Sequence, residues 1–536
     1  MNKLSSRTLF LLIALSWNSI SFAQWVTHHQ AVAQPNVPKP TVNLPMTDPR
    51  FGTTLIRISN ARASGCAGVV PQYSKRQAWN ADESRLLLFT GDGLALLYDG
   101  ATYRFIQVLD AVWGEDVFWY PIDPAIIILA QDNALFAYHV ESGSLRLLCS
   151  FPEYTFINTR GEGNLTRDGR YYAFVGQVYD ENVQVTYFKD LVVYDLVANQ
   201  IVAKLTLPGT LTDFDWVSIS PLGNYVVVDY ATSNTGRFEG VEVYDRSFNF
   251  LWQKPLGAGH SDLGIDANGD EVLVMAYYND QTNSNFIKKY RLADGQETSL
   301  LEVSWQFDCH ISCQNQARSE WCFVSTFDGE ARLTDDSLSW LPFEDEIFAL
   351  KLDGSGEVQR VAHHHSRRFS PTTPDRDNSV YWAEPHATVS RDAGRVLFGS
   401  NWREDIESDS SVDSYVVDFR AWLGVDESMR LLPNEIYLAQ NYPNPFNAST
   451  VISYQLPVSS HVELSICNLL GQKILTLVSE QQVAGIHRFN WEASGLASGM
   501  YLYRLEATDP GRSLSRREMR GSGQDFVQSK KLILMR

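Results

Sequence analysis

The sequence predicts an all-β protein, with a seven-bladed β-propeller over residues 50–419 and an immunoglobulin-like β-sandwich over residues 435–536. Three observations predict this fold class. Short runs of β-branched and aromatic residues, each after a turn built from Asp, Asn, Gly or Pro, fill the first region. One turn-and-strand motif recurs there seven times. The tail alternates apolar and polar residues in the manner of half-buried strands.

The recurring motif consists of an apolar residue, a polar turn and an apolar strand. Its copies are WNADESRLLLF, YPIDPAIIILA, LTRDGRYYAFV, ISPLGNYVVVD, IDANGDEVLVM, the degenerate CQNQARSEWCFV and VSRDAGRVLFG. They lie about 40 to 75 residues apart, a period that favours propeller blades of four strands. We expect LIRIS (Leu55–Ser59) to pair with SYVVDF (Ser414–Phe419) and so close the ring without free sheet edges.

These repeats resemble those of TolB-like propellers, which carry an SxDG turn before an apolar strand. The resemblance covers most of residues 50–419 and implies the fold. It says little about activity, because propellers host many unrelated functions.

Composition and charge narrow the classes of function. At 536 residues the chain is longer than one core usually supports, which predicts at least two domains. The formal net charge is −19 and no basic stripe offsets it, so nucleic acid is not an expected partner. No segment is apolar enough over sufficient length to predict a transmembrane helix.

The N-terminus has the layout of a signal peptide over residues 1–23. Lys3 and Arg7 precede an apolar stretch, Leu9–Trp17, and Ser21-Phe22-Ala23 forms a small-x-small cleavage site. The mature chain is therefore predicted to begin at Gln24, with residues 24–49 as a linker to the propeller.

The C-terminal region, after a linker at 420–434, resembles the sorting domain of proteins exported by the type IX secretion system. The resemblance depends on NYPNPFN, NLLGQKI, GMYLYRLEA and the final KKLILMR, with an arginine-rich insertion at Asp509–Phe526. It implies the secretion machinery as a partner and a secreted or cell-surface location. The positions that carry it are Asn441, Tyr442, Pro443, Asn444, Pro445, Phe446, Gly471, Gly499, Tyr501, Lys530 and Lys531.

Three of the six cysteines, Cys309, Cys313 and Cys322, lie close in sequence. In an exported protein this spacing predicts one disulfide among them, and it matches no standard zinc knuckle. A separate HHHSRR run, His363–Arg368, is expected in a solvated loop of blade seven, with a metal or anion site as the alternative.

The central channel is where we expect functional residues, because the innermost strand of each blade lines it. Counting back from the repeat turns, the last three blades place His260 with Asp262, Asp308 with His310, and Glu384 with His386. Since strand side chains alternate with a period of two, these groups are predicted to share one face. Imidazole and carboxylate groups suit a divalent metal or acid–base catalysis. A purely structural polar channel is the alternative.

The segment PHATVSRDAGRVLFGS (Pro385–Ser400) is similar to the histidine-bearing repeat of oligogalacturonate lyases, which are seven-bladed propellers that hold a divalent metal. Ulvan lyases are propellers with His, Tyr and Arg at the site. The resemblance implies that His310 and His386 are ligands or bases and that Arg76 or Arg160 neutralises a uronate carboxylate. The implied cofactor is a divalent metal such as Mn, Zn or Ca, held by residues among His260, Asp262, His310, Glu384 and His386.

Three hypotheses for function follow. The first is an exported propeller that binds a carbohydrate or protein ligand at the channel mouth. The second is a metal-assisted polysaccharide lyase that acts on uronate-containing polymers. The third is a structural scaffold without a small-molecule site. A lyase releases an unsaturated product that absorbs in the ultraviolet, which a binding protein or a scaffold does not.

Overall fold

The computed structural model describes residues 25–535 apart from 210, 212–213, 231–235, 280–281, 329–338, 368–380, 403–410, 424–436, 439, 442–443, 457–459, 483–484, 494 and 509–525. The signal peptide predicted for residues 1–23 lies outside this part of the chain. Nearly all regular structure in the described residues is β-strand, as the sequence predicts.

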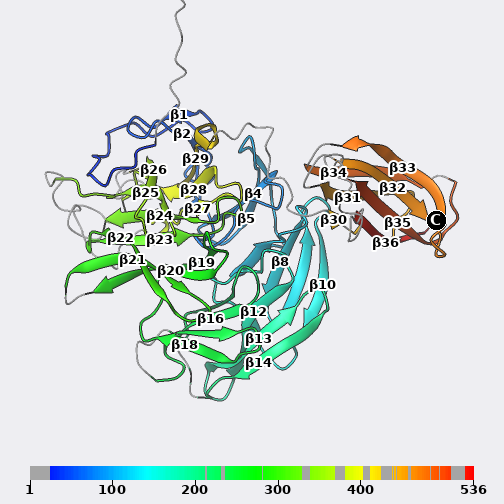
Figure 1. The fold of residues 1–536 in the computed structure, drawn as a ribbon, viewed down its shortest axis with the longest axis horizontal. Helices are drawn as coiled ribbons and strands as arrows, with labels where there is room; N and C mark the ends of the chain where they lie inside the picture. The colour runs from blue at the N-terminus through cyan, green and yellow to red at the C-terminus, as the bar shows by residue number, and fades with distance from the viewer. Residues whose placement is uncertain are drawn as a thin grey trace, which may run out of the picture.

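Seven antiparallel sheets form the propeller, and Figure 1 shows them as successive blades. Six contain four strands each, in sequence order. Blade one has β3 (Val69–Val70), β4 (Arg85–Thr90), β5 (Ala95–Asp99) and β6 (Phe105–Val108). Blade two has β7 (Asp116–Trp119), β8 (Ile126–Gln131), β9 (Ala134–His139) and β10 (Ser144–Ser150). Blade three has β11 (Phe156–Asn158), β12 (Tyr171–Asp180), β13 (Val185–Asp195) and β14 (Gln200–Thr206).

The next three blades follow the same plan. Blade four has β15 (Trp216–Ile219), β16 (Tyr225–Tyr230), β17 (Gly240–Asp245) and β18 (Phe250–Lys254). Blade five has β19 (Asp262–Ile265), β20 (Glu271–Asn279), β21 (Ser284–Arg291) and β22 (Glu297–Val303). Blade six has β23 (Phe307–Ser312), β24 (Trp321–Asp328), β25 (Glu346–Lys351) and β26 (Val358–His363).

Blade seven closes the ring with strands from both ends of the propeller region. It has β27 (Thr388–Val389), β28 (Arg395–Ser400), β29 (Asp413–Asp418), β2 (Thr54–Arg57) and β1 (Met46–Thr47), in that order. Two 3₁₀ turns, η3 (Tyr381–Ala383) and η4 (Arg420–Leu423), lie beside it. Leu55 is paired with Val417, which confirms the predicted closure of LIRIS on SYVVDF.

Burial explains the composition of the strands. The second strand of a blade lies between two neighbouring blades, so both of its faces are covered, and residues 226–230 of β16 are all buried. This is why the repeat strands are continuous apolar runs and not alternating ones. The outermost strand faces solvent, and all four residues of β6 are exposed.

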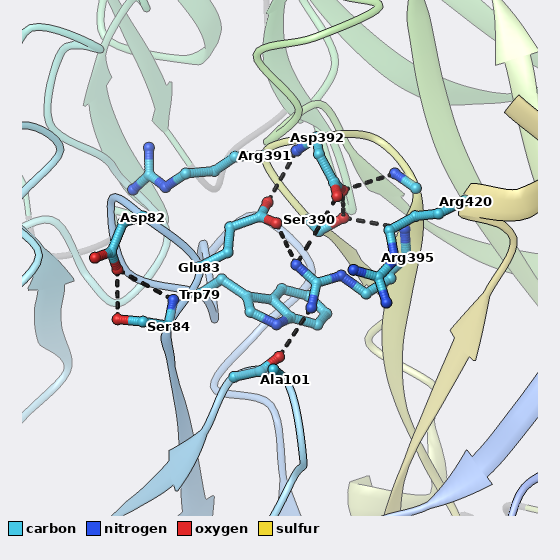
Figure 2. A network of polar contacts seen from close by, with 12 residues as sticks. Trp79, Asp82, Glu83, Ser84, Ala101, Ser390, Arg391, Asp392, Arg395 and Arg420 are labelled. Carbon is cyan, nitrogen blue, oxygen red and sulfur yellow. Dashed lines mark hydrogen bonds and ion pairs between the residues drawn. The ribbon is translucent and has the colours of Figure 1, made fainter. Parts of the chain in front are cut away.

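The seam between blades seven and one is held by charged groups (Figure 2). Arg395, which is almost fully buried, forms an ion pair with Glu83 from the first repeat turn. Its Nη1 also donates to the Gly100 carbonyl at 2.8 Å. The Asp392 backbone N–H donates to Glu83 Oε1 at 2.9 Å. The polar turns of the repeat thus connect the first and last blades.

The segment before the propeller is packed against blades six and seven. Arg360 Nη1 donates to the carbonyls of His28 and Gln30, at 3.1 and 2.6 Å. Trp402 Nε1 donates to Val37 O at 3.0 Å. Residues 25–40, predicted as part of a linker, therefore cover two blades, and we call them the N-terminal strap.

The HHHSRR run does not lie in a solvated loop of blade seven, so that prediction is wrong. His363 ends β26 of blade six, and the side chains of His363, His364 and His365 are all buried. His363 Nε2 lies 3.0 Å from Val32 O, and the His365 ring stacks on Trp402. The strap and blade seven cover these rings, which sequence periodicity does not reveal.

The C-terminal region forms two sheets around its own core. The first contains β30 (Tyr437–Leu438), β31 (Ser449–Leu456) and β34 (Gly485–Glu492). The second, in the order β33-β32-β35-β36, contains β33 (Lys473–Gln482), β32 (Ser460–Cys467), β35 (Gly499–Thr508) and β36 (Phe526–Leu534). Trp491 and Tyr503 belong to the core between them.

The NYPNPFN segment is joined to the final strand. Asn444 Oδ1 accepts a hydrogen bond from the Ile533 backbone N–H at 2.8 Å, and Asn444 Nδ2 donates to Lys531 O at 3.1 Å. Asn441 and Phe446 are buried, and Pro445 follows Asn444 in the chain. Gly471 takes a positive φ of 77° in a turn. Gly499 and Tyr501 lie on β35, Lys530 and Lys531 on β36, while Tyr442 and Pro443 fall outside the described residues.

Candidate functional site

A short segment of blade one, Tyr73–Gln77, lies across the channel. It follows β3, which has only two residues, and its contacts reach blades on the far side. Lys75 pairs with Glu162 of blade three, and Asn164 Nδ2 donates to Lys75 O at 2.8 Å. Gln77 Nε2 donates to Gln314 O of blade six at 3.1 Å. The segment thereby contacts both blade three and blade six.

Next to Tyr73 of this segment, blades five to seven bring together imidazole and carboxylate groups. One ligand atom each from His260, His310 and Glu384 lies within 4.8 Å of the others. His310 Nε2 is 3.5 Å and His386 Nε2 is 3.7 Å from Glu384 Oε2. The His310 ring stacks on His260 with centroids 4.2 Å apart and lies 4.3 Å from the His386 ring. We call these four residues the His–Glu cluster.

The local backbone explains how each group reaches the cluster. His310 lies within β23, whereas His260 precedes β19. Glu384 follows η3, and its backbone N–H donates to Tyr381 O at 3.0 Å. His386 has a positive φ of 42°, a conformation that is uncommon outside glycine and often found at functional sites.

Asp308 controls the charge of His260. Its Oδ1 lies 3.4 Å from His260 Nδ1 and accepts a hydrogen bond from Tyr278 Oη at 2.6 Å. Burial opposes both charges, but the ion pair outweighs it, raising the pKa of His260 and lowering the pKa of Asp308 to about 2. A carboxylate behind a histidine is the usual support of a metal ligand or a base.

Asp262 does not join the cluster, contrary to the period-two prediction. Its carboxylate accepts hydrogen bonds from the Cys313 backbone N–H at 2.6 Å and from Gln314 Nε2 at 2.9 Å. Burial raises the pKa of Asp262 to about 6. The residue joins blade five to blade six, because unsatisfied backbone donors between blades need an acceptor.

The two predicted arginines are also placed differently from the expectation. Arg76 is buried, with Nη2 at 2.7 Å from Asp116 Oδ1 and Nε donating to Gly161 O at 3.1 Å. Among the described residues it has no contact with the cluster imidazoles. Arg160 is exposed at a positive φ of 61°, and its guanidinium lies 5.9 Å from the Phe188 ring. The guanidinium of Arg76 therefore binds groups of blades two and three.

Other residues of the site were not predicted. The Tyr73 ring lies 5.6 Å from His310 and 5.1 Å from His386, between centroids. Burial and then the charge of Glu162 raise the pKa of Tyr73, so its hydroxyl stays protonated. Lys75 Nζ lies 4.2 Å from the Trp216 ring centroid. Pro71 and the short β3 take these residues out of the strand register, so counting by two misses them.

The donor set of the cluster fits a transition metal better than calcium. Imidazole nitrogen with carboxylate oxygen is the ligand chemistry of zinc, manganese or iron, whereas calcium prefers oxygen ligands alone. His260, His310 and Glu384 offer three converging donor atoms, and His386 lies beside them. The carboxylates of Glu384 and Asp308, which lie beside these imidazoles, further favour a cation.

All six cysteines are free thiols in the structure, so the disulfide expected among Cys309, Cys313 and Cys322 is not formed. The three are buried between blades five and six. Ser312 pairs with Phe323, which places Cys313 and Cys322 opposite each other at the end of the β23–β24 ladder. The side-chain hydrogen bond with Cys322, and then burial, raise the pKa of the Cys313 thiol.

Residues 440–513 match the family of secretion system C-terminal sorting domains. The chain is thus exported by the type IX secretion system to the cell surface or the medium, and the machinery of that system is a partner. No curated protein matches the sequence. Among the described residues, no helix combines the length and apolar character needed to cross a bilayer.

Two solved structures share the propeller fold. An oligogalacturonate lyase from Vibrio parahaemolyticus has a TM-score of 0.50 and 12% identity, covering 72% of this chain and 97% of that one. An oligogalacturonate lyase in complex with manganese has a TM-score of 0.50 and 15% identity, covering 70% of this chain and 96% of that one. At these identities the likeness establishes the fold.

Proposed function

We propose that the protein is an exported, metal-dependent lyase that acts on uronate-containing polysaccharides. The observation that carries the proposal is the convergence of His260, His310 and Glu384 within 4.8 Å at the channel. The manganese complex of a lyase with the same fold supports a metal in such a propeller. Export by the sorting domain supports an extracellular polymer as substrate.

In this proposal His260, His310 and Glu384 hold a manganese or zinc ion. When bound, such an ion would supply positive charge beside the uronate carboxylate, which would make the proton α to it more acidic. Asp308 orients His260 through its Nδ1, as a carboxylate commonly does behind a metal-ligating histidine. The buried position of His310 and Glu384 excludes water and strengthens their electrostatic effect.

His386 is the proposed base. Its ring lies 5.1 Å from both Tyr73 and Tyr381, and its Nε2 is 3.7 Å from Glu384. It removes the proton from carbon 5 of the sugar. Tyr73, whose pKa is raised, donates a proton to the leaving oxygen as the bond at carbon 4 breaks, which leaves a double bond in the product.

The experiment compares variants of the full chain loaded with Mn²⁺ or Zn²⁺ on polygalacturonate and on other uronate polymers. We expect product absorbing in the ultraviolet, abolished by chelation. His260→Ala should lose the metal and the activity together, whereas His386→Ala should keep the metal and lose turnover by about 10²-fold or more. His461→Ala, an exposed histidine of the sandwich, is the matched control.

A second candidate function is binding of an extracellular carbohydrate or protein ligand without turnover. It is favoured by the placement of Arg76, which pairs with Asp116 and so supplies no charge to a uronate at the cluster. Retained metal and retained polymer binding without any unsaturated product would favour this second function over the lyase.

A further inference from the structure

A cavity that none of the His–Glu cluster residues lines is bordered by Arg76 and Gln77 and lies where the innermost strands run into the repeat turns. Its volume is about 70 Å³, enough for several water molecules or one small anion. All seven blades contribute to its wall. Three of the side chains that line it are arginines, Arg76, Arg167 and Arg391. No carboxylate residue is among the lining residues.

Arg391 comes from the turn of blade seven and is buried, with 5% of its surface exposed. Its Nε donates to Asn80 O at 3.2 Å. Figure 2 shows its guanidinium extending away from Glu83, which pairs with Arg395 instead. Burial, together with the nearby charge of Arg167, lowers the pKa of Arg391 to about 10, although Glu83 and Asp82 act in the opposite sense.

Arg167 occupies the equivalent position in the turn of blade three. Its Nη2 donates to Asn315 O at 2.9 Å. Burial lowers the pKa of Arg167, and Asp262 and Glu271 partly compensate for this. Among the described residues, neither Arg167 nor Arg391 has a salt bridge. The two like charges therefore face one cavity without a direct counter-charge.

Arg76 adds a third guanidinium from the channel-crossing segment. Its Nη2 is paired with Asp116, but its buried Nη1 has no hydrogen-bond partner in the part of the chain that the structure describes. Only 3% of the residue is exposed. A buried guanidinium donor without an acceptor costs free energy, and a planar fork of N–H groups matches the oxygens of an oxyanion.

We propose that this cavity binds a small oxyanion of the sulfate or phosphate type. The anion would accept hydrogen bonds from Arg76, Arg167 and Arg391 and offset the two charges that have no salt bridge. It would join blades one, three and seven across the channel. The proposal does not depend on the lyase function, because the His–Glu cluster shares none of these three residues.

The test measures thermal unfolding of the full chain in sodium sulfate, sodium phosphate and sodium chloride at equal ionic strength. We expect saturable stabilisation by the oxyanions that chloride does not reproduce. The same measurement in free galacturonate distinguishes binding of an inorganic anion from binding of the carboxylate of a sugar. Titration calorimetry with sulfate gives the stoichiometry, expected to be one anion per chain.

Two variants test whether the cavity arginines bind the anion. Arg391→Gln and Arg167→Gln should each weaken sulfate binding by at least 10-fold, roughly what loss of one charged hydrogen bond causes. Arg170→Gln, an exposed arginine of the same blade, should bind as the wild type does. Arg391 is buried, so its replacement can also affect folding. If Arg391→Gln does not fold, the sulfate affinity of Arg167→Gln decides the test. Equal stabilisation by chloride, or full sulfate affinity in Arg167→Gln, would overturn the proposal.

Discussion

Two aspartates of neighbouring innermost strands have different roles because their partners differ. Asp308 faces an imidazole and stays charged, with its pKa lowered to about 2. Asp262 faces backbone and amide donors between blades. Its pKa is instead raised to about 6 by burial. The environment of each carboxylate thus decides whether it supports chemistry or connects blades.

Asp229 gives a pH prediction away from the cluster. Burial, and then the charge of Asp215, raise the pKa of Asp229 to about 7. The folded state holds a proton there that the unfolded state releases near its ordinary pKa, so stability falls as pH rises toward 7. Asp229→Asn should therefore gain unfolding free energy over wild type between about pH 5 and 7, on the order of 2 kcal/mol, with no further gain above it.

Urea unfolding of both proteins at several pH values measures this difference. Asp132→Asn, at an exposed turn, serves as the control and should follow the wild-type pH dependence. A constant difference between Asp229→Asn and wild type across this pH range would contradict the assigned pKa.

At the residue scale, the sequence predicted most of the cluster. His260, His310, Glu384 and His386 lie together because the repeat gives the register of the inner strands. The prediction for Asp262 was wrong because alternation does not say which acceptors the neighbouring blade requires. Arg76 was misplaced for a similar reason, since its partner Asp116 belongs to another blade and no local pattern records such a pair.

At the scale of elements, the closure of the ring depends on β29 and its partner β2. Asp413 at the start of β29 is buried and accepts a hydrogen bond from the Ala61 backbone N–H at 2.8 Å. Its Oδ2 also lies 2.8 Å from Arg57 Nη2 and 3.0 Å from Lys39 Nζ. One carboxylate of β29 thus adds ion pairs with β2 and the strap to the backbone pairing of β2 with β29.

Asp413→Asn should destabilise the propeller by about 3 kcal/mol, because it leaves two partly buried cations without their partner. Asp418→Asn, on the same strand, removes a part-buried ion pair with the single cation Arg420 and should cost less, about 1 kcal/mol. Denaturant unfolding of both variants gives the comparison. Equal costs would mean that the seam does not depend on Asp413.

Elements that break the repeat were the hardest to predict. The strands after each turn motif follow from composition, and so does the pairing of β2 with β29. The Tyr73–Gln77 segment does not follow the alternation of an inner strand. The preceding strand, β3, has only two residues, and the segment itself forms hydrogen bonds with blades three and six. The strap and the buried histidines of β26 were missed because their burial depends on long-range packing.

At the scale of the molecule, the propeller and the sandwich have separate cores. The buried cluster of the sandwich contains residues 438–534 only, while the propeller clusters end before residue 424. A chain that ends at residue 434 should therefore fold and show the same metal content as the full chain. Circular dichroism and metal analysis check this, and an unfolded or metal-free truncated protein would contradict the separation of roles.

The central claim is that His260, His310 and Glu384 form a metal site. Elemental analysis of the full chain, dialysed after incubation with Mn²⁺ or Zn²⁺, tests it most directly. We predict one ion per chain in the wild type and in the His461→Ala control, and none in His310→Ala or Glu384→Ala. A wild-type protein without bound metal, or variants that retain it fully, would contradict the claim.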